Sequence, residues 1–166
     1  MNKCLLLESG GWSDHSFLSE GRRLATAIVM PNATYFFGGY DTPKTWEWLP
    51  SGSSFWQSGG EIPGLGHHFG CGASISETEL VLIGGTDSKQ DILKFNVKTN
   101  QWTQMGQPLL EGRSHQACAK LENAILVSGG LDPEGNELAS TELIDMPASC
   151  RRHAGVLLVK QQKFFG

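Results

Sequence analysis

The stretch Leu80-Val81-Leu82-Ile83-Gly84-Gly85, four apolar residues followed by two glycines, decides the fold because its pattern recurs along the chain. An apolar stretch also runs into two glycines at Thr34–Gly39 and at Ile125–Gly130. The successive glycine pairs are 46 and 45 residues apart. A period in the mid-forties indicates an array of similar supersecondary units, so the repeat must be read before any single motif.

The composition suits many short strands joined by tight turns. The chain has 166 residues, of which 21 are glycine and only 18% are charged. A net charge of −4 without a basic cluster argues against a nucleic-acid surface. No apolar run approaches the length of a membrane-spanning helix. We therefore expect neither nucleic acid nor membrane as a partner.

A tryptophan marks a second feature that recurs in each unit. The windows 2–12, 46–56 and 92–102 each contain an extended segment, a polar turn and a final tryptophan, which is typical of a β-hairpin. A loop and two further strands separate each tryptophan from the next glycine pair. Each unit thus holds four short antiparallel strands, a to d. The predicted units cover about 22–58, 67–104 and 113–145, the last lacking strand d, with partial units at 2–15 and 151–166.

Four-stranded antiparallel units of this period predict an all-β fold, a β-propeller of about three to four blades. So few blades are expected to form an incomplete ring. The alternative is a small closed ring in which residues 2–13 complete a blade with residues 154–166. The residues predicted to be structural are the glycines that end strand b and the tryptophans that pack between blades, namely Gly38, Gly39, Gly84, Gly85, Gly129, Gly130, Trp12, Trp56 and Trp102.

The chain resembles a kelch-repeat protein over nearly its whole length, most clearly around residues 102–130. The resemblance rests on Trp102, on Arg113 and His115 before a strand of small residues, on Asn123 in the a–b turn, and on Gly129-Gly130 after an apolar strand. It implies a propeller that binds other proteins, as many kelch-like adaptors of cullin-based ubiquitin ligases do behind a BTB domain. No BTB-like segment precedes the repeats, so a cullin partner is expected only if such a region lies outside this chain.

The resemblance makes a protein-interaction module the expected function, specifically the substrate-binding propeller, or a fragment of it, of a kelch-like ubiquitin-ligase adaptor. We expect no enzymatic activity and no cofactor, and a protein or acidic peptide as the partner. The alternative is a secreted or intracellular propeller with enzymatic or carbohydrate-binding activity, since some kelch propellers are enzymes.

The cysteines bear on the compartment. Cys4, Cys71, Cys118 and Cys150 lie far apart without a Cys-x-x-Cys pair, which favours separate thiols in the cytoplasm. A secreted protein with disulfides is the alternative, and the N-glycosylation sequon Asn32-Ala33-Thr34 gives it some weight.

The candidate binding surface is the rim formed by the d–a and b–c loops, because long loops on a rigid scaffold usually carry binding residues. The candidates are Arg22, Arg23, Tyr40, Asp41, His67, His68, Asp87, Lys89, Arg113, His115, Asp132, Glu134, Asn136, Arg151, Arg152 and His153. Arginines are suited to pairing with carboxylates. The Arg-x-His position of Arg113 and His115 belongs to the repeat itself, so a structural role is the other interpretation there. Adjacent histidines point apart on a strand, so His67, His68 and Cys71 do not predict a metal site.

Overall fold

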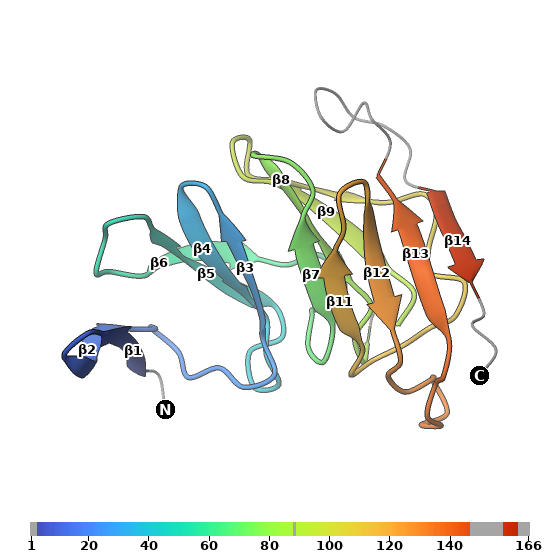
Figure 1. Ribbon diagram of the computed structural model, residues 1–166, viewed down its shortest axis with the longest axis horizontal. Coiled ribbons are helices and arrows are strands. Elements are labelled where there is room, and N and C mark those ends of the chain that lie inside the picture. The colour runs from blue at the N-terminus through green and yellow to red at the C-terminus, as the bar shows by residue number, and fades with distance from the viewer. Residues whose placement is uncertain (1–2, 88, 147–157, 163–166) are drawn as a thin grey trace.

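The computed structural model describes residues 3–87, 89–146 and 158–162. These residues form fourteen strands and no helix, arranged as one two-stranded and three four-stranded antiparallel sheets (Figure 1). The strands are β1 (Lys3–Glu8) and β2 (Gly11–Phe17); β3 (Thr26–Met30), β4 (Ala33–Phe37), β5 (Thr45–Pro50) and β6 (Gln57–Glu61); β7 (Cys71–Ser74), β8 (Glu79–Ile83), β9 (Ile92–Asn96) and β10 (Gln101–Gln104); and β11 (Ala117–Lys120), β12 (Ala124–Ser128), β13 (Thr141–Asp145) and β14 (Leu158–Gln162). None of these residues belongs to a helix long and apolar enough to span a membrane.

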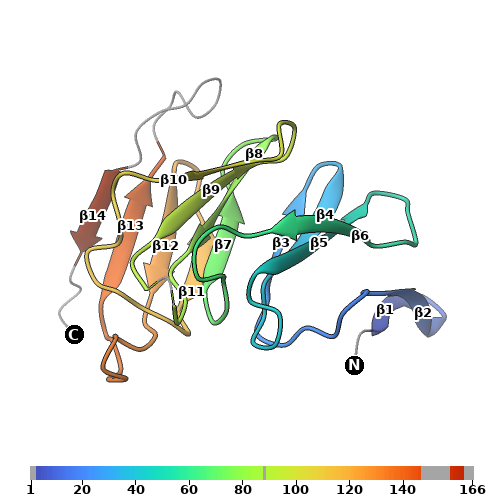
Figure 2. The same cartoon turned by 180° about the vertical axis from the view of Figure 1, so that it is seen from behind.

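Each four-stranded sheet is an up-and-down meander in which sequence neighbours pair, and this confirms the predicted all-β antiparallel class. The first strands of the three sheets lie side by side, β3 next to β7 and β7 next to β11. The views from both sides show the remaining strands of each sheet following in chain order away from this inner row (Figures 1 and 2). The repeat in the sequence is therefore a repeat of whole sheets.

Strand β8 is buried on both faces, which explains why its apolar run does not alternate with polar residues. Leu80 and Leu82 face a core shared with the β3–β6 sheet. Val81 and Ile83 point the other way, into a core shared with the β11–β14 sheet. Successive side chains on a strand point to opposite faces, so four consecutive apolar residues supply both interfaces at once.

The first two glycine pairs join their sheets to the loop of the next repeat. Gly39 N donates to His67 O over 3.0 Å, and Gly85 N donates to Arg113 O over the same distance. Both residues of each pair have positive φ, +64° and +123° in the first. A Cβ at Gly38 would lie 1.7 Å from His67 O, so the close approach of the two backbones requires glycine there.

Two of the three predicted tryptophans pack between sheets. The Trp102 ring lies tilted against Phe95 of its own sheet, with centroids 4.5 Å apart, and meets Phe37 of the preceding sheet edge to face. Trp56 Nε1 donates to Ser16 Oγ of the two-stranded sheet over 2.9 Å. For Trp12 the prediction is wrong, because its side chain is 68% exposed on β2. Among the described residues, β1 and β2 pack mainly on each other, so no further sheet covers the ring.

The third sheet has a fourth strand that the sequence analysis did not assign to it. Strand β14 pairs antiparallel with β13, from Asp145 opposite Leu158 to Thr141 opposite Gln162. It therefore does not pair with β1 or β2 in a closed four-bladed ring, and it is not the start of a further unit over 151–166. The edge of β13 offers unpaired backbone groups to the next extended segment whether or not a tryptophan marks it. The rest of that predicted unit lies outside the described residues.

A disulfide links two of the three sheets. Cys71 on β7 and Cys118 on β11 are joined, with their Cα atoms 5.8 Å apart. That separation is usual for a disulfide, and it arises because the two inner strands run next to each other. The expectation of separate thiols is therefore wrong for this pair. Cys4 is a free thiol, and Cys150 lies outside the described residues.

Candidate functional site

Three equivalent loop residues, one in front of each inner strand, adopt a left-handed backbone. Leu24, Phe69 and His115 have φ of 61°, 55° and 60°. The Phe69 N–H donates to Leu24 O, and the His115 N–H donates to Phe69 O, so the three positions form a chain across the sheets. A left-handed conformation costs a non-glycine residue about 1–2 kcal/mol. Such strain is found preferentially at functional sites, which makes this row the starting point for a site.

Aromatic and cationic side chains extend this row into a continuous surface. We define the rim band as Arg23, Tyr40, His68, Phe69 and His115. The Arg23 guanidinium carbon lies 4.3 Å above the centre of the Tyr40 ring. The ring centres of Tyr40 and Phe69 are 6.2 Å apart, and those of Phe69 and His115 only 3.8 Å. The rim band thus runs across all three repeats, from the loop before β3 to the loop before β11.

Most of the rim band is open to solvent. Tyr40 is 51% exposed and His115 is exposed, whereas Phe69 is half-buried and His68 is 9% exposed. Two carboxylates flank it. Asp41 accepts from Arg23 over 3.0 Å, and both side chains of that pair are about 60% exposed. Asp87 Oδ2 lies 3.4 Å from His68 Nδ1. The rim band therefore offers aromatic faces, with charged groups that water reaches and a ligand can displace.

Two predicted contact residues, Arg22 and Arg113, are instead buried inside the scaffold. The Arg22 side chain is 1% exposed and its Nε donates to Glu47 over 3.0 Å. Its Nη1 also donates to Gly38 O, at the glycine pair that ends β4. These contacts tie the loop before β3 to two strands of the same sheet. Arg22 is thereby removed from the candidate contact surface.

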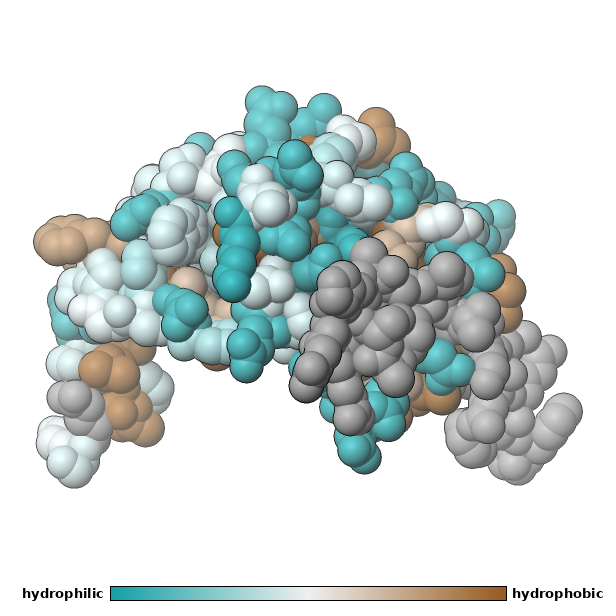
Figure 3. Space-filling model, turned by 90° about the horizontal axis from the view of Figure 1, so that it is seen from above, coloured by the Kyte–Doolittle hydropathy of each residue, from teal (hydrophilic) through white to brown (hydrophobic). Residues whose placement is uncertain are grey.

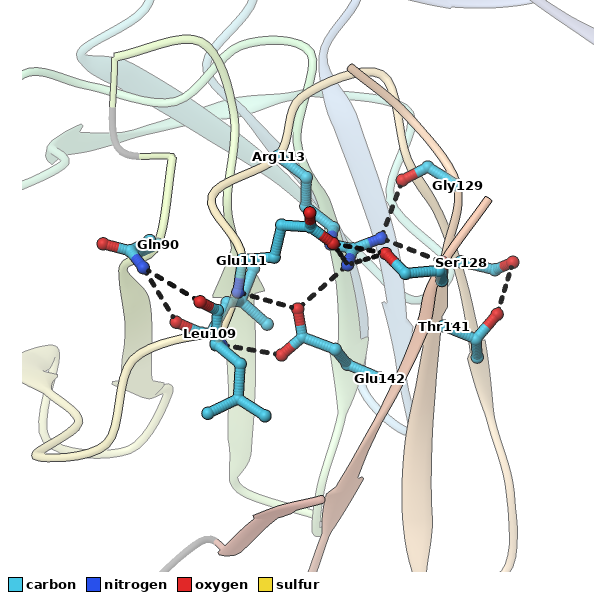
Figure 4. A network of polar contacts seen from close by, with 10 residues as sticks. Gln90, Leu109, Glu111, Arg113, Ser128, Gly129, Thr141 and Glu142 are labelled. Carbon is cyan, nitrogen blue, oxygen red and sulfur yellow. Dashed lines mark hydrogen bonds and ion pairs between the residues drawn. The ribbon is translucent and has the colours of Figure 1, made fainter. Parts of the chain in front are cut away.

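Arg113 repeats this arrangement in the third sheet (Figure 4). Its fully buried guanidinium donates to Glu142 over 2.9 Å and to Gly129 O over the same distance. Glu142, also fully buried, accepts in addition from the backbone N–H groups of Leu110 and Glu111. The structural interpretation of Arg113 is therefore the correct one. Figure 4 shows the Arg113 side chain pointing toward Gly129 and Glu142, between its own loop and β13.

His67 occupies the same position in the middle repeat and is likewise unavailable to a ligand. His67 is only 2% exposed, and its Nε2 lies 2.8 Å from Thr26 Oγ1 of β3. Burial, with a further effect from the neighbouring His68, lowers the pKa of His67 to about 4. The ring is neutral at physiological pH and can pair with the Thr26 hydroxyl without a counter-ion. His67 therefore joins β3 to the loop before β7.

The remaining candidates lie apart from the rim band. Lys89 is half-buried, and its Nζ donates to Pro133 O over 3.4 Å. The loop after β12 folds on itself, because Asp132 accepts from the backbone N–H groups of Glu134 and Asn136. The Asn136 side chain, as the largest of several hydrogen-bonding effects, lowers the pKa of the Asp132 carboxyl. The last predicted candidates, Arg151, Arg152 and His153, lie outside the described residues.

No metal centre emerges where the structure is described. Within residues 3–87, 89–146 and 158–162, no three His, Cys, Asp or Glu side chains converge as metal ligands would. His67 and His68 point in different directions, the first toward Thr26 and the second toward Asp87. The Cys71 sulfur is taken up in the disulfide. His67, His68 and Cys71 therefore have separate structural partners.

Several important residues were not candidates in the sequence analysis. Leu24 and Phe69 were not identified as candidates. Each follows the first residue of its loop pair, Arg22 or His67, by two positions, just as His115 follows Arg113. That constant offset was the available signal. Glu47 and Glu142, the buried partners of the two arginines, were missed because residue type alone does not separate a buried carboxylate in a strand from an exposed one.

Comparison with known proteins supports the fold and goes no further. No protein-family model matches the chain, and no curated protein matches it in sequence. Among solved structures, one described as "Structure of YjhT" superposes with a TM-score of 0.76 at 16% sequence identity. The superposition covers 96% of this chain and 52% of that one, so this chain spans about half the length of its structural neighbour. At this identity the likeness shows a shared arrangement of sheets.

Proposed function

We propose that the three four-stranded sheets are blades of a kelch-type β-propeller, that β1 and β2 belong to a further blade, and that the rim band binds a protein partner. The observation that carries this proposal is the unbroken row from Arg23 to His115, which crosses three repeats and in which Phe69 and His115 have a strained backbone. Aromatic rings and arginine guanidinium groups are the side chains that most often dominate the binding energy of protein interfaces. A row that crosses repeats suits an extended peptide segment.

The chemistry of the rim band defines the kind of segment it would bind. Arg23 is the exposed arginine among the predicted anchors that the structure describes, since Arg22 and Arg113 are buried. A carboxylate of the partner would take the place of Asp41 at Arg23, and an apolar or aromatic side chain would pack on Phe69 and His115. We therefore propose a segment with one acidic and one apolar anchor in place of a highly acidic peptide.

The role as a ubiquitin-ligase adaptor, which the kelch resemblance implies, is not the one that we favour. An adaptor of that kind works in the reducing cytoplasm, where structural disulfides are rare. The Cys71–Cys118 disulfide favours an oxidising compartment. Protein binding through the rim band does not depend on this choice.

Site-specific photocrosslinking tests the proposed surface directly. A benzoylphenylalanine residue in place of Tyr40 should give a discrete protein adduct in an extract of the source tissue. The matched control carries the same probe in place of Phe55, which is 80% exposed on the β5–β6 connection. Arg23→Glu, introduced with the probe at position 40, should reduce the adduct at least tenfold, because the loss of an arginine that acts as an interface hot spot typically costs about 2 kcal/mol or more.

Two results would contradict the assignment. Equal adducts from the probes at positions 40 and 55 would show non-specific capture. An adduct at position 40 that Arg23→Glu leaves unchanged would show that the guanidinium takes no part in binding. The Arg23 side chain is 62% exposed, so the substitution should leave thermal unfolding nearly unchanged and a loss of binding cannot be attributed to unfolding.

A further inference from the structure

We infer that Asn32 is an N-glycosylation site and that the chain matures in the secretory pathway. Asn32-Ala33-Thr34 is the single Asn-x-Ser/Thr triplet in the sequence, and its middle residue is not proline. Any N-linked glycan on this chain must therefore be attached to Asn32. The sequence alone cannot separate a used triplet from a chance one, but the structure supplies two independent observations.

The first observation is the place of Asn32 in the fold. It lies in the two-residue turn between β3 and β4 and is exposed, while Ala33 directly after it is buried. Its backbone oxygen accepts from Ser51 N over 2.9 Å, which fixes the turn and leaves the side chain outside it. A bulky glycan can leave the protein here without displacing any packed side chain.

The turn also lies at the far end of the sheet from the rim band. Six residue steps, through the whole of β4, separate Asn32 from Gly38, which is about 20 Å along the strand. Figure 1 shows the β3–β4 hairpin at the upper end of the molecule, and Figure 3 looks onto that end. The described surface there is mostly hydrophilic in Figure 3, with hydrophobic residues only in small patches. A glycan on this end would leave the rim band free.

The second observation is the Cys71–Cys118 disulfide, which is remote from Asn32 in sequence. Two thiols lose two protons and two electrons when they form it, and a disulfide-bearing oxidoreductase of the secretory pathway accepts the electrons and becomes a dithiol. Such bonds form and persist in oxidising compartments and are rare in the cytoplasm. The enzyme that modifies Asn-x-Ser/Thr triplets acts in the same compartments. The disulfide and the exposed triplet therefore point to one environment.

The modification itself is a glycosyl transfer to the side-chain amide. The Asn32 Nδ2 atom forms a bond to the anomeric carbon of a lipid-linked diphosphate oligosaccharide. The bond from that carbon to the phosphate oxygen breaks, the lipid diphosphate leaves, and the amide loses one proton. The Thr34 hydroxyl is required for recognition of the triplet by the transferase.

Expression behind a cleavable signal peptide in animal cells tests the site with four forms of the full chain. Wild type and Thr34→Ser keep the triplet, whereas Asn32→Gln and Thr34→Ala destroy it. We expect the first two to gain electrophoretic mobility after peptide N-glycosidase treatment and the last two to be unaffected by it. Both cell membranes and medium are analysed, so a form that is retained in the cell is still scored. A wild-type chain that enters the membrane fraction and is insensitive to the enzyme would overturn the site.

Protein from the natural source tests the compartment. Peptide N-glycosidase converts a glycosylated Asn32 to aspartate, and non-reducing digestion preserves a peptide that contains Cys71 linked to Cys118. Mass spectrometry should find both products. An unmodified Asn32 together with free thiols at the two cysteines would overturn the inference, while leaving the rim band and its crosslinking test untouched.

Discussion

Glu142→Gln should be among the most destabilising single changes at a polar residue in this protein. The glutamine keeps the size of the side chain but removes the charge opposite Arg113, whose guanidinium is completely buried. It also turns one of the two acceptor oxygens into a donor, although both oxygens accept backbone or guanidinium N–H groups in the folded state. Removing one partner of a buried ion pair typically costs about 3–5 kcal/mol. The Glu111 carboxylate lies 3.3 Å from the Arg113 guanidinium and keeps part of its charge compensated, so we expect the lower end of this range.

The structure contains matched controls for this prediction. Asp41→Asn breaks the ion pair with Arg23, in which both side chains are about 60% exposed, and should cost at most about 1 kcal/mol. Glu47→Gln breaks the equivalent buried pair with Arg22 in the first four-stranded sheet and should resemble Glu142→Gln, because its partner is only 1% exposed. The comparison separates the effect of burial from the effect of losing one carboxylate.

Urea unfolding at pH 7, monitored by tryptophan fluorescence, measures the three variants against wild type. The midpoint should fall strongly for Glu142→Gln and Glu47→Gln and hardly at all for Asp41→Asn, with a similar dependence on urea in each. If Glu142→Gln lost no more than Asp41→Asn, the buried network would contribute nothing beyond a surface pair, and the structural role given to Arg113 would be refuted.

Three further perturbations follow from the fold. The pKa of His67 is lowered to about 4, so the unfolded chain takes up a proton below pH 6.5 that the native state refuses, and stability should fall by about 2 kcal/mol between pH 7 and pH 5. The stability difference between wild type and His67→Gln should change by that amount over this range, and a constant difference would contradict the burial argument. Reduction of the disulfide between Cys71 and Cys118, which are 47 residues apart, should lower the free energy of unfolding by up to about 4 kcal/mol. An unchanged urea midpoint with and without reductant would show that the bond does not constrain the unfolded chain. Gly84→Ala places a Cβ 2.7 Å from a backbone oxygen at φ +60° and should destabilise the protein by at least about 2 kcal/mol. In the control Gly10→Ala, nothing lies within 4 Å of the new Cβ, so stability should hardly change. Equal melting temperatures for the two variants would refute the close-approach argument.

The repeat could be predicted from the sequence because its physical requirements are local. A strand buried on both faces needs an unbroken apolar run, and a backbone crossing at its end needs glycine, so Leu80–Gly85 carries both signals in six residues. The four-stranded meander follows from the spacing of these runs and of the tryptophan hairpins. For the same reason β14 was misassigned, because it is held by the edge of β13 and has no tryptophan of its own.

The site was harder to predict because it depends on contacts between repeats. Nothing in the residue types separates Arg22 from Arg23, although one is buried against Glu47 and the other is exposed beside Tyr40. The disulfide between Cys71 and Cys118 likewise depends on two inner strands meeting in space. Residue type indicated which side chains could bind a partner, and only the three-dimensional arrangement showed which of them are free to do so.

At Leu24, Phe69 and His115 the backbone geometry is the same in every repeat, whereas the side chain is different in each. The three positions share one conformation, fixed by hydrogen bonds from one repeat to the next, yet they hold an aliphatic, an aromatic and an imidazole side chain. Glycine at any of them would relieve about 1–2 kcal/mol of backbone strain. The greater freedom of glycine in the unfolded chain and the loss of the ring contact between Phe69 and His115 would oppose this gain. A residue larger than glycine nevertheless stands there in all three repeats, as expected where some stability is given up for function. For protein engineering, these positions form a ready-made library site, where side chains can be exchanged to change the ligand while the scaffold keeps its shape.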